Sequence, residues 1–157
     1  GWLQEHPKDA VFHFYMGEYA TSLQDYAGAS KHYQSVLQLQ ANNVLALNNL
    51  AWVGGKINDP RSLEYAERAN VLAPNQPALM DTLAMLLADN GKMDRSLQIL
   101  NQALVLAPKA ADIRLNLARV LIKAGKTADA KIALDEIAKL GGAYPRQAEA
   151  AELRKNL

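Results

Sequence analysis

Histidine is the residue type here that most often does chemistry, because imidazole binds metals and transfers protons near neutral pH. The chain has three, His6, His13 and His32. A metal-binding helix motif places two histidines four residues apart, and none of these three has such a partner. His13 falls where the repeat described below carries a large packing residue, so we expect its role to be structural. We expect no metal site.

Carboxylates and glycine pairs do not indicate a catalytic site either. Asp135 and Glu136 are expected on a helix surface, which does not make them a pair poised for acid–base chemistry. The glycine pairs at residues 54–55 and 141–142 lack the spacing of a phosphate-binding loop. The sequence has no nucleophile-elbow motif. We therefore expect a protein that is not an enzyme and binds no cofactor.

Composition argues against two classes of partner. The chain has 157 residues, of which 50% are hydrophobic and 21% are charged, as in ordinary globular proteins. Its 17 basic and 16 acidic residues nearly cancel, so we expect no nucleic-acid partner. Polar residues interrupt every apolar stretch before it is long enough to span a bilayer, so we expect no direct membrane insertion. Cysteine is absent, which is compatible with the cytoplasm and with the periplasm.

A repeated pattern runs through most of the chain. Residues 36–42, 69–75 and 103–109 are three similar segments, which mark the same part of successive repeats. Residues 47–51, 80–84 and 114–118 are a second set of similar segments. The step from Pro74 to Pro108 is 34 residues, which is the period of the tetratricopeptide repeat (TPR). The pattern resembles that repeat.

Small residues recur where TPR helices approach each other closely. The first such position holds Gly17, Ala51, Ala84 and Ala118, and the second holds Ala29, Ser62, Ser96 and Ala130. A third position holds Tyr33, Ala66, Leu100 and Leu134. Spacings of three, four and seven residues place these positions on one helical face. A single hairpin cannot bury that face, so we expect neighbouring hairpins to stack.

The pattern therefore predicts an all-α fold, a right-handed superhelical solenoid of helix-turn-helix repeats with a C-terminal capping helix. In this register the repeats are residues 10–43, 44–76, 77–110 and 111–140, the capping helix is 145–157, and residues 1–9 are a linker or the tail of a preceding repeat. All of these form one domain. Because the chain starts abruptly at Gly1, we expect it to be a fragment of a longer protein.

Turn and cap residues agree with this register. We expect Gly91 and Gly125 to end the first helices of their hairpins in the left-handed conformation. The residues that we expect to cap second helices are Asp25, Asp59 and Thr127. The glycine pair at residues 54–55 leads us to expect that the helix starting near Val44 ends early.

A narrower resemblance lies in the middle of the chain. Residues 42–52 and 59–69, followed by Asp81-Thr82-Leu83, are similar to the C-terminal part of the PEP-CTERM/exosortase-associated TPR lipoproteins. That resemblance implies a lipid-anchored protein of the bacterial envelope, in the periplasm or at the outer membrane, that accompanies exopolysaccharide and protein-sorting systems. The cytoplasm stays an alternative location.

The first helix of each repeat in a TPR solenoid lines a concave groove. The residues that we expect to bind a peptide there are Tyr15 and Glu18 in the first repeat, Asn48, Asn49 and Trp52 in the second, Asp81, Thr82 and Met85 in the third, and Asn116, Arg119 and Lys123 in the fourth. Phe14, Leu45 and Leu115 are expected on the same surface. Asn49 and Asn116 offer amide hydrogen bonds to a peptide backbone, and Tyr15 and Trp52 offer apolar anchors.

Other interpretations of these residues remain open. One interpretation is that Asn49 and Trp52 contact a partner. The other is that asparagine is simply common at this repeat position and that Trp52 packs between helices. The TPR domains that bind chaperone C-termini use a clamp of lysine and asparagine. Phe14 and Glu18 stand at two clamp positions instead, so we expect no C-terminal carboxylate ligand. Arg119 and Lys123 receive an acidic segment or are solvated charges.

These observations predict a protein–protein interaction scaffold that holds a protein or peptide segment in its groove. The alternative is a structural spacer or oligomerisation module of a larger TPR protein. Trp2, Leu3, Phe12 and Phe14 cluster near the N-terminal end. Exposed apolar residues promote association, so self-association through that end is a further expectation.

Overall fold

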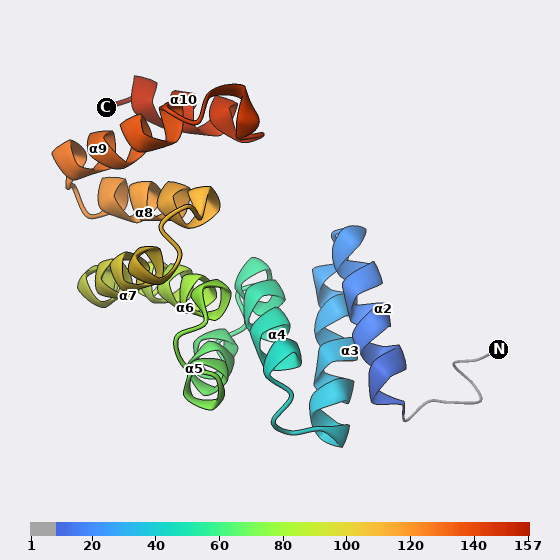
Figure 1. Ribbon diagram of the computed structural model, residues 1–157. Helices are drawn as coiled ribbons and strands as arrows, with labels where there is room; N and C mark the ends of the chain where they lie inside the picture. Colours follow the sequence, from blue (N-terminus) through green and yellow to red (C-terminus); the bar gives the residue numbers. More distant parts are fainter. Residues whose placement is uncertain (1–8) are drawn as a thin grey trace. The chain divides into compact units, whose positions relative to one another are not determined.

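The computed structural model describes residues 9–157, which contain nine α-helices, one short 3-10 helix and no strand (Figure 1). Trp2, Leu3 and His6 lie outside the described residues. The chain divides into two compact units between Pro74 and Asn75. Unit 1 contains α2 (Ala10–Ser22), α3 (Tyr26–Leu39), α4 (Val44–Lys56) and α5 (Ser62–Leu72). Unit 2 contains α6 (Pro77–Asp89), α7 (Met93–Leu106), α8 (Ala111–Lys123), α9 (Thr127–Ala138), the 3-10 helix η1 (Gly141–Ala143) and α10 (Gln147–Lys155).

Each unit is built from consecutive helical hairpins. In unit 1, α2 packs against α3 and α4 packs against α5, and the two hairpins meet through α3 and α4. In unit 2 the hairpins are α6–α7 and α8–α9, which meet through α7 and α8, and α10 packs against α9 (Figure 1). None of the helices between Ala10 and Lys155 is long and apolar enough to cross a lipid bilayer. The predicted all-α fold of stacked hairpins is confirmed.

The small residues of the repeat are buried where the two helices of a hairpin meet. Ala51, Ala84 and Ala118 are fully buried, and Gly17 is buried in the first hairpin. A Cβ atom at Gly17 would lie 2.6 Å from Cε1 of Tyr33, which is closer than carbon atoms can pack. Tyr33 itself is only 1% exposed. The first hairpin therefore pairs glycine with tyrosine at these two repeat positions. The second hairpin pairs alanine with alanine there, and the other two pair alanine with leucine.

All four hairpins turn through a residue with positive φ at the same place. Gly91 and Gly125 have φ of 78° and 76°, as predicted, and Gln24 and Asn58 take the same conformation at 59° and 55°. The residue after each one donates its backbone N–H to a carbonyl five residues earlier, for example Lys92 to Leu87 (2.9 Å). This is the hydrogen-bond pattern of a Schellman motif. The sequence indicated only the two glycines.

The prediction that α4 ends early at its glycine pair is wrong. α4 continues to Lys56, and the turn residue is Asn58. A Cβ atom at Gly54 would lie 2.2 Å from the Oγ atom of Ser62. Gly54 is therefore needed for the close approach of α4 and α5, and not for ending the helix.

Acidic and amide side chains cap three helices of unit 1. Asp9, Asp25 and Asn43 accept hydrogen bonds from backbone N–H groups three residues later, at 2.9–3.1 Å. The predicted role of Asp25 is confirmed. The other two predicted caps are wrong: Asp59 accepts from the N–H of Arg61 in a turn before α5, and Thr127 is the first residue inside α9.

The C-terminal helix α10 begins at Gln147 and not at Pro145. The Nε2 atom of Gln147 donates to the backbone carbonyls of Ile137 and Gly141, at 2.7 and 3.0 Å. Tyr144 and Ala150 are buried in the core of unit 2. These contacts connect α10 to the end of α9 through polar and apolar groups.

Two serines at the same repeat position give a matched stability prediction. The Oγ of Ser96 donates to the Ala84 carbonyl at 2.6 Å, whereas the buried Oγ of Ser62 has no hydrogen-bond partner. A satisfied buried hydroxyl stabilises a protein, and an unsatisfied one costs desolvation free energy. We expect Ser62→Ala to raise the free energy of unfolding by about 1 kcal/mol and Ser96→Ala to lower it by about 1 kcal/mol. Urea denaturation followed by circular dichroism measures both, and shifts in the same direction would contradict this account.

Candidate functional site

The eleven residues predicted to bind a peptide are divided between the two units. Tyr15 and Glu18 lie on α2, and Asn48, Asn49 and Trp52 lie on α4, all in unit 1. Asp81, Thr82 and Met85 lie on α6, and Asn116, Arg119 and Lys123 lie on α8, all in unit 2. The two groups differ in how their side chains are used.

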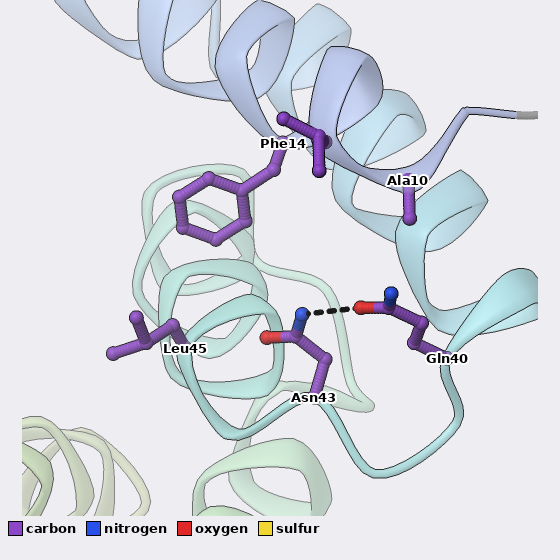
Figure 2. A pocket seen from close by; sticks show the side chains of 6 residues that line it. Ala10, Phe14, Gln40, Asn43 and Leu45 are labelled. Carbon is purple, nitrogen blue, oxygen red and sulfur yellow. Dashed lines mark hydrogen bonds between the residues drawn. The ribbon is translucent and has the colours of Figure 1, made fainter.

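Unit 1 has an apolar pocket between the first turns of α2 and α4. Its volume is about 180 Å³, and its lining residues are Ala10, Val11 and Phe14 of α2, Leu45 of α4, and Gln40 and Asn43 from the connection before α4. Figure 2 shows Phe14 and Leu45 beside the linked Asn43 and Gln40, whose side chains hydrogen-bond at 2.9 Å. The pocket is therefore apolar where α2 and α4 line it and polar where the α3–α4 connection lines it.

Large apolar side chains are exposed around this pocket. Val11 is 76% exposed, Tyr15 is 64% exposed and Leu45 is 61% exposed. Scattered exposed apolar residues are normal on proteins, but a contiguous group beside a pocket marks an interaction surface. We call Val11, Phe14, Tyr15 and Leu45 the apolar patch. Of these four, Tyr15 was predicted to bind a peptide and Phe14 and Leu45 were expected on the same surface, whereas Val11 was not predicted.

A polar group lies next to the apolar patch, between α2 and α4. The amide nitrogen of Asn49 lies 3.5 Å from the hydroxyl oxygen of Tyr33. Burial raises the pKa of Tyr33, hydrogen bonds to Thr21 and Asn49 oppose that rise, and the nearby negative charge of Glu18 adds to it. Glu18 is exposed, and no cationic side chain within residues 9–157 forms an ion pair with it.

Trp52 is both packed and exposed. Its ring meets the ring of Tyr26 edge-on, with centroids 5.7 Å apart, and the ammonium of Lys56 lies 4.8 Å from the Trp52 ring. The residue is nevertheless 42% exposed. Neighbouring Asn48 is half-buried, and its Oδ1 atom is buried without a hydrogen-bond partner. The α4 surface thus presents a partly held aromatic ring, whereas the unpaired Asn48 oxygen lies buried beneath the surface.

In unit 2 the corresponding asparagine is occupied by its own neighbours. The amide nitrogen of Asn116 donates to both carboxylate oxygens of Asp81, at 3.0 and 3.1 Å, and its oxygen accepts from Arg119 at 3.1 Å. Burial raises the pKa of Asp81, and the hydrogen bonds from Asn116 oppose that rise. A peptide backbone would have to break these bonds before Asn116 could bind it.

The same network continues onto the C-terminal helix. Arg119 donates to Glu149, which also accepts from Arg146 at 2.9 Å. Arg146 reaches Asp112 at 3.3 Å, and the Tyr144 hydroxyl donates to Asp112 at 2.6 Å. Burial and the Asp112 carboxylate raise the pKa of Tyr144 to about 12. The sequence does not reveal this network, because the pairs Arg119–Glu149 and Tyr144–Asp112 are 30 and 32 positions apart along the chain.

The remaining predicted residues of unit 2 are also used internally. The hydroxyl of Thr82 donates to a carbonyl one turn earlier, and Met85 packs against the core. Lys123 donates to the carbonyl of Ala88 at 3.2 Å. The expectation that Leu115 faces the groove is wrong, because Leu115 is fully buried.

The structure brings together two histidines that the sequence spacing kept apart. The Nδ1 atoms of His13 on α2 and His32 on α3 are 3.2 Å apart, so one imidazole donates a hydrogen bond and the other accepts it. The pKa of His32 is lowered by burial and by the charge of His13, and Asp25 partly opposes this. Within the described residues, no group of three or more acidic, histidine or cysteine side chains is arranged to hold a metal ion.

This histidine pair predicts a pH dependence of stability. Because the pKa of His32 is lower in the folded state, the unfolded chain takes up this proton more readily, and folding stability falls as the pH drops through about 6.5. We expect the free energy of unfolding to fall between about pH 7.5 and about pH 5.5. In His32→Gln that loss should be smaller. Urea denaturation at several pH values compares the two proteins, and equal losses would contradict the prediction.

Comparison with known proteins agrees with the fold. Residues 87–157 match the family model described as Tetratricopeptide repeat. A MamA structure from Desulfovibrio magneticus RS-1 is 19% identical, with 88% of this chain and 79% of that chain covered and a TM-score of 0.79. YrrB, described as a TPR protein with an unusual peptide-binding site, is 20% identical, with 96% and 78% covered and a TM-score of 0.76. A TPR protein from Parabacteroides merdae ATCC 43184 is 17% identical, with 87% and 54% covered and a TM-score of 0.79.

At these identities the solved structures establish the fold alone. No curated protein sequence matches the chain. The family model and the helical hairpins both indicate the TPR fold. The fold is that of TPR proteins, and residues 87–157 match the TPR family model.

Proposed function

We propose that the chain is a protein-interaction scaffold that holds a peptide segment of a partner on the α2–α4 surface of unit 1. The observation that carries the proposal is the apolar patch beside its pocket. Val11, Tyr15 and Leu45 each expose more than half of their surface there. Exposed aliphatic and aromatic residues around a concave site are the usual features of a peptide-binding surface.

The contrast with unit 2 supports this choice of surface. Asn116, Arg119 and Lys123 are each hydrogen-bonded within their own unit. A ligand at that surface would have to replace existing bonds, which leaves little net free energy for binding. On the α2–α4 surface the ligand would cover apolar area that is now in water, which favours binding. YrrB, which shares the fold, is described as having a peptide-binding site.

The experiment is a selection from a random displayed peptide library against the purified chain. We expect enriched peptides whose binding is weakened by Val11→Ser or Leu45→Ser. Val71→Ser is the matched control, because Val71 is a similarly exposed valine of unit 1 (79% against 76%) that lies on α5. Enriched peptides that bind all variants equally would place the site elsewhere, and no enrichment would argue for a spacer.

The two asparagines sharpen the test. We expect Asn49→Ala to weaken the selected peptides and Asn116→Ala to leave their affinity unchanged, because only Asn116 is saturated by Asp81 and Arg119. Circular dichroism checks that both variants remain helical. An Asn116→Ala effect as large as that of Asn49→Ala would mean that unit 2 also contacts the peptide.

The cellular setting is proposed on the sequence resemblance alone. We place the scaffold in an envelope assembly linked to exopolysaccharide or exosortase systems, with the structural spacer or oligomerisation module as the alternative. Two experiments test this. Cells of the native organism are fractionated, and partners are then captured from the envelope fraction with the native chain and with the Val11→Ser variant. Recovery of the protein only in the cytoplasmic fraction would overturn the envelope assignment without affecting the peptide-binding proposal.

A further inference from the structure

The acidic residue next to the apolar patch has no counter-charge. Glu18 is exposed on α2, one helical turn after Phe14, and forms no ion pair within residues 9–157. On α4, Asn49 is neutral and contacts the Tyr33 hydroxyl, and Lys56 lies over the ring of Trp52. Among the described residues, Glu18 therefore presents an uncompensated negative charge one helical turn from Phe14 in the pocket wall.

Glu18 and Asn49 each carry an oxygen acceptor suited to a cation. The Glu18 carboxylate acts on the Tyr33 hydroxyl, and the Asn49 amide nitrogen points toward the same hydroxyl at 3.5 Å. Within residues 9–157, no hydrogen bond is made to the amide oxygen of Asn49. A lysine ammonium has three N–H donors and an arginine guanidinium has five, and neither has an acceptor. A carboxylate at this place would meet like charge, whereas a basic side chain would meet oxygen acceptors.

The spacing between pocket and charge limits the ligand further. Phe14 and Glu18 are four residues apart on α2, a rise of about 6 Å along the helix. In an extended peptide, two residues advance about 6.6 Å, and side chains two apart point to the same side. In a peptide that runs along α2, an apolar side chain in the pocket therefore places the side chain two residues away beside Glu18.

We propose that the occupant of the α2–α4 surface is an extended peptide with an apolar anchor for the pocket and a lysine or arginine two residues from it, paired with Glu18. This inference rests on the proposed function and names its ligand class. The pocket supplies most of the affinity, and Glu18 supplies the preference for a basic residue.

The test uses three biotinylated peptide pools that share a fixed leucine and carry lysine, glutamine or glutamate both two positions before and two positions after it. We expect the lysine pool to bind about three- to tenfold more tightly than the glutamate pool at low salt. The difference should shrink in high salt, because screening weakens exposed charge pairs. Glu18→Gln should remove the preference, and Glu18→Lys should reverse it.

Controls separate this inference from the proposed function. Glu64→Gln changes an exposed acidic residue on α5 of the same unit and should leave the lysine preference intact. Equal binding of the three pools, with Val11→Ser still weakening all of them, would overturn the basic-ligand inference and keep the peptide-binding proposal. Binding of no pool would overturn both. A preference for glutamate in the native chain would also overturn the inference.

Discussion

Replacing Gly17 by valine is expected to destabilise unit 1 by about 3 kcal/mol, because the new side chain enters a fully packed helix contact. A Cβ atom at Gly17 would already lie 2.6–2.9 Å from three ring carbons of Tyr33. Tyr33 is 1% exposed and has no free space to move into. Hydrogen–deuterium exchange measured peptide by peptide should show faster exchange in α2 and α3.

A double substitution checks the packing explanation. The hairpins of unit 2 use alanine with leucine at the same two positions, for example Ala84 with Leu100. We therefore expect Gly17→Ala to be less destabilising in a Tyr33→Leu background than alone, by about 1–2 kcal/mol. Additive losses would mean that the Gly17 contact with Tyr33 is not what limits the size of residue 17.

Replacing Leu100 by alanine is expected to lower the free energy of unfolding of unit 2 by about 3 kcal/mol, through lost burial and the cavity left behind. Leu100 is fully buried on α7 among the core residues of this unit. Urea denaturation followed by circular dichroism measures the loss. Exchange in α6, α7 and α8 should accelerate more than exchange in unit 1.

The matched control lies on the same helix. Val105 is 81% exposed on α7, so Val105→Ala removes aliphatic carbon without opening a cavity. We expect a change within about 0.5 kcal/mol of zero. A loss comparable with that of Leu100→Ala would show that the Val105 surface is covered by something in solution, such as a second copy of the chain.

The surfaces around Asn49 in unit 1 and Asn116 in unit 2 differ, although the repeat pattern predicts that they are equivalent. Asn49 and Asn116 stand at corresponding positions, and both were expected to bind a peptide. In unit 2, Asn116 donates to Asp81 and accepts from Arg119, and Arg119 in turn donates to Glu149. In unit 1, the comparable region has an amide held at 3.5 Å and, beside an apolar pocket, a carboxylate that forms no ion pair within residues 9–157.

The Glu18 proposal also bears on the expectation that no C-terminal carboxylate binds here. That expectation came from comparing residue types with a known clamp. The structure adds that Phe14 forms part of a pocket wall and that Glu18 has no ion-pair partner among the described residues. A glutamate pool that binds more tightly than the lysine pool would show that this surface accepts a carboxylate, against the Glu18 proposal.

The sequence by itself determined the hairpin fold. Small residues such as Ala51, Ala84 and Ala118 recur at helical spacing, and helix packing depends on that local spacing, so the contacts could be predicted before any coordinates were known. Gly91 and Gly125 marked two turns because glycine adopts positive φ without steric cost. The fold class and the buried face of each hairpin followed from these local rules.

Only the tertiary structure decided the other turns and the state of each candidate site. Gln24 and Asn58 adopt positive φ because the packed helices on either side impose a tight Schellman turn, which overrides the preference of a non-glycine residue. Glu149 meets Arg119, and His13 meets His32, across gaps of 30 and 19 residues that no periodic pattern encodes. Whether a surface residue binds a ligand or a neighbour depends on such long-range contacts, so the sequence identified candidate residues and the structure showed which of them are already occupied.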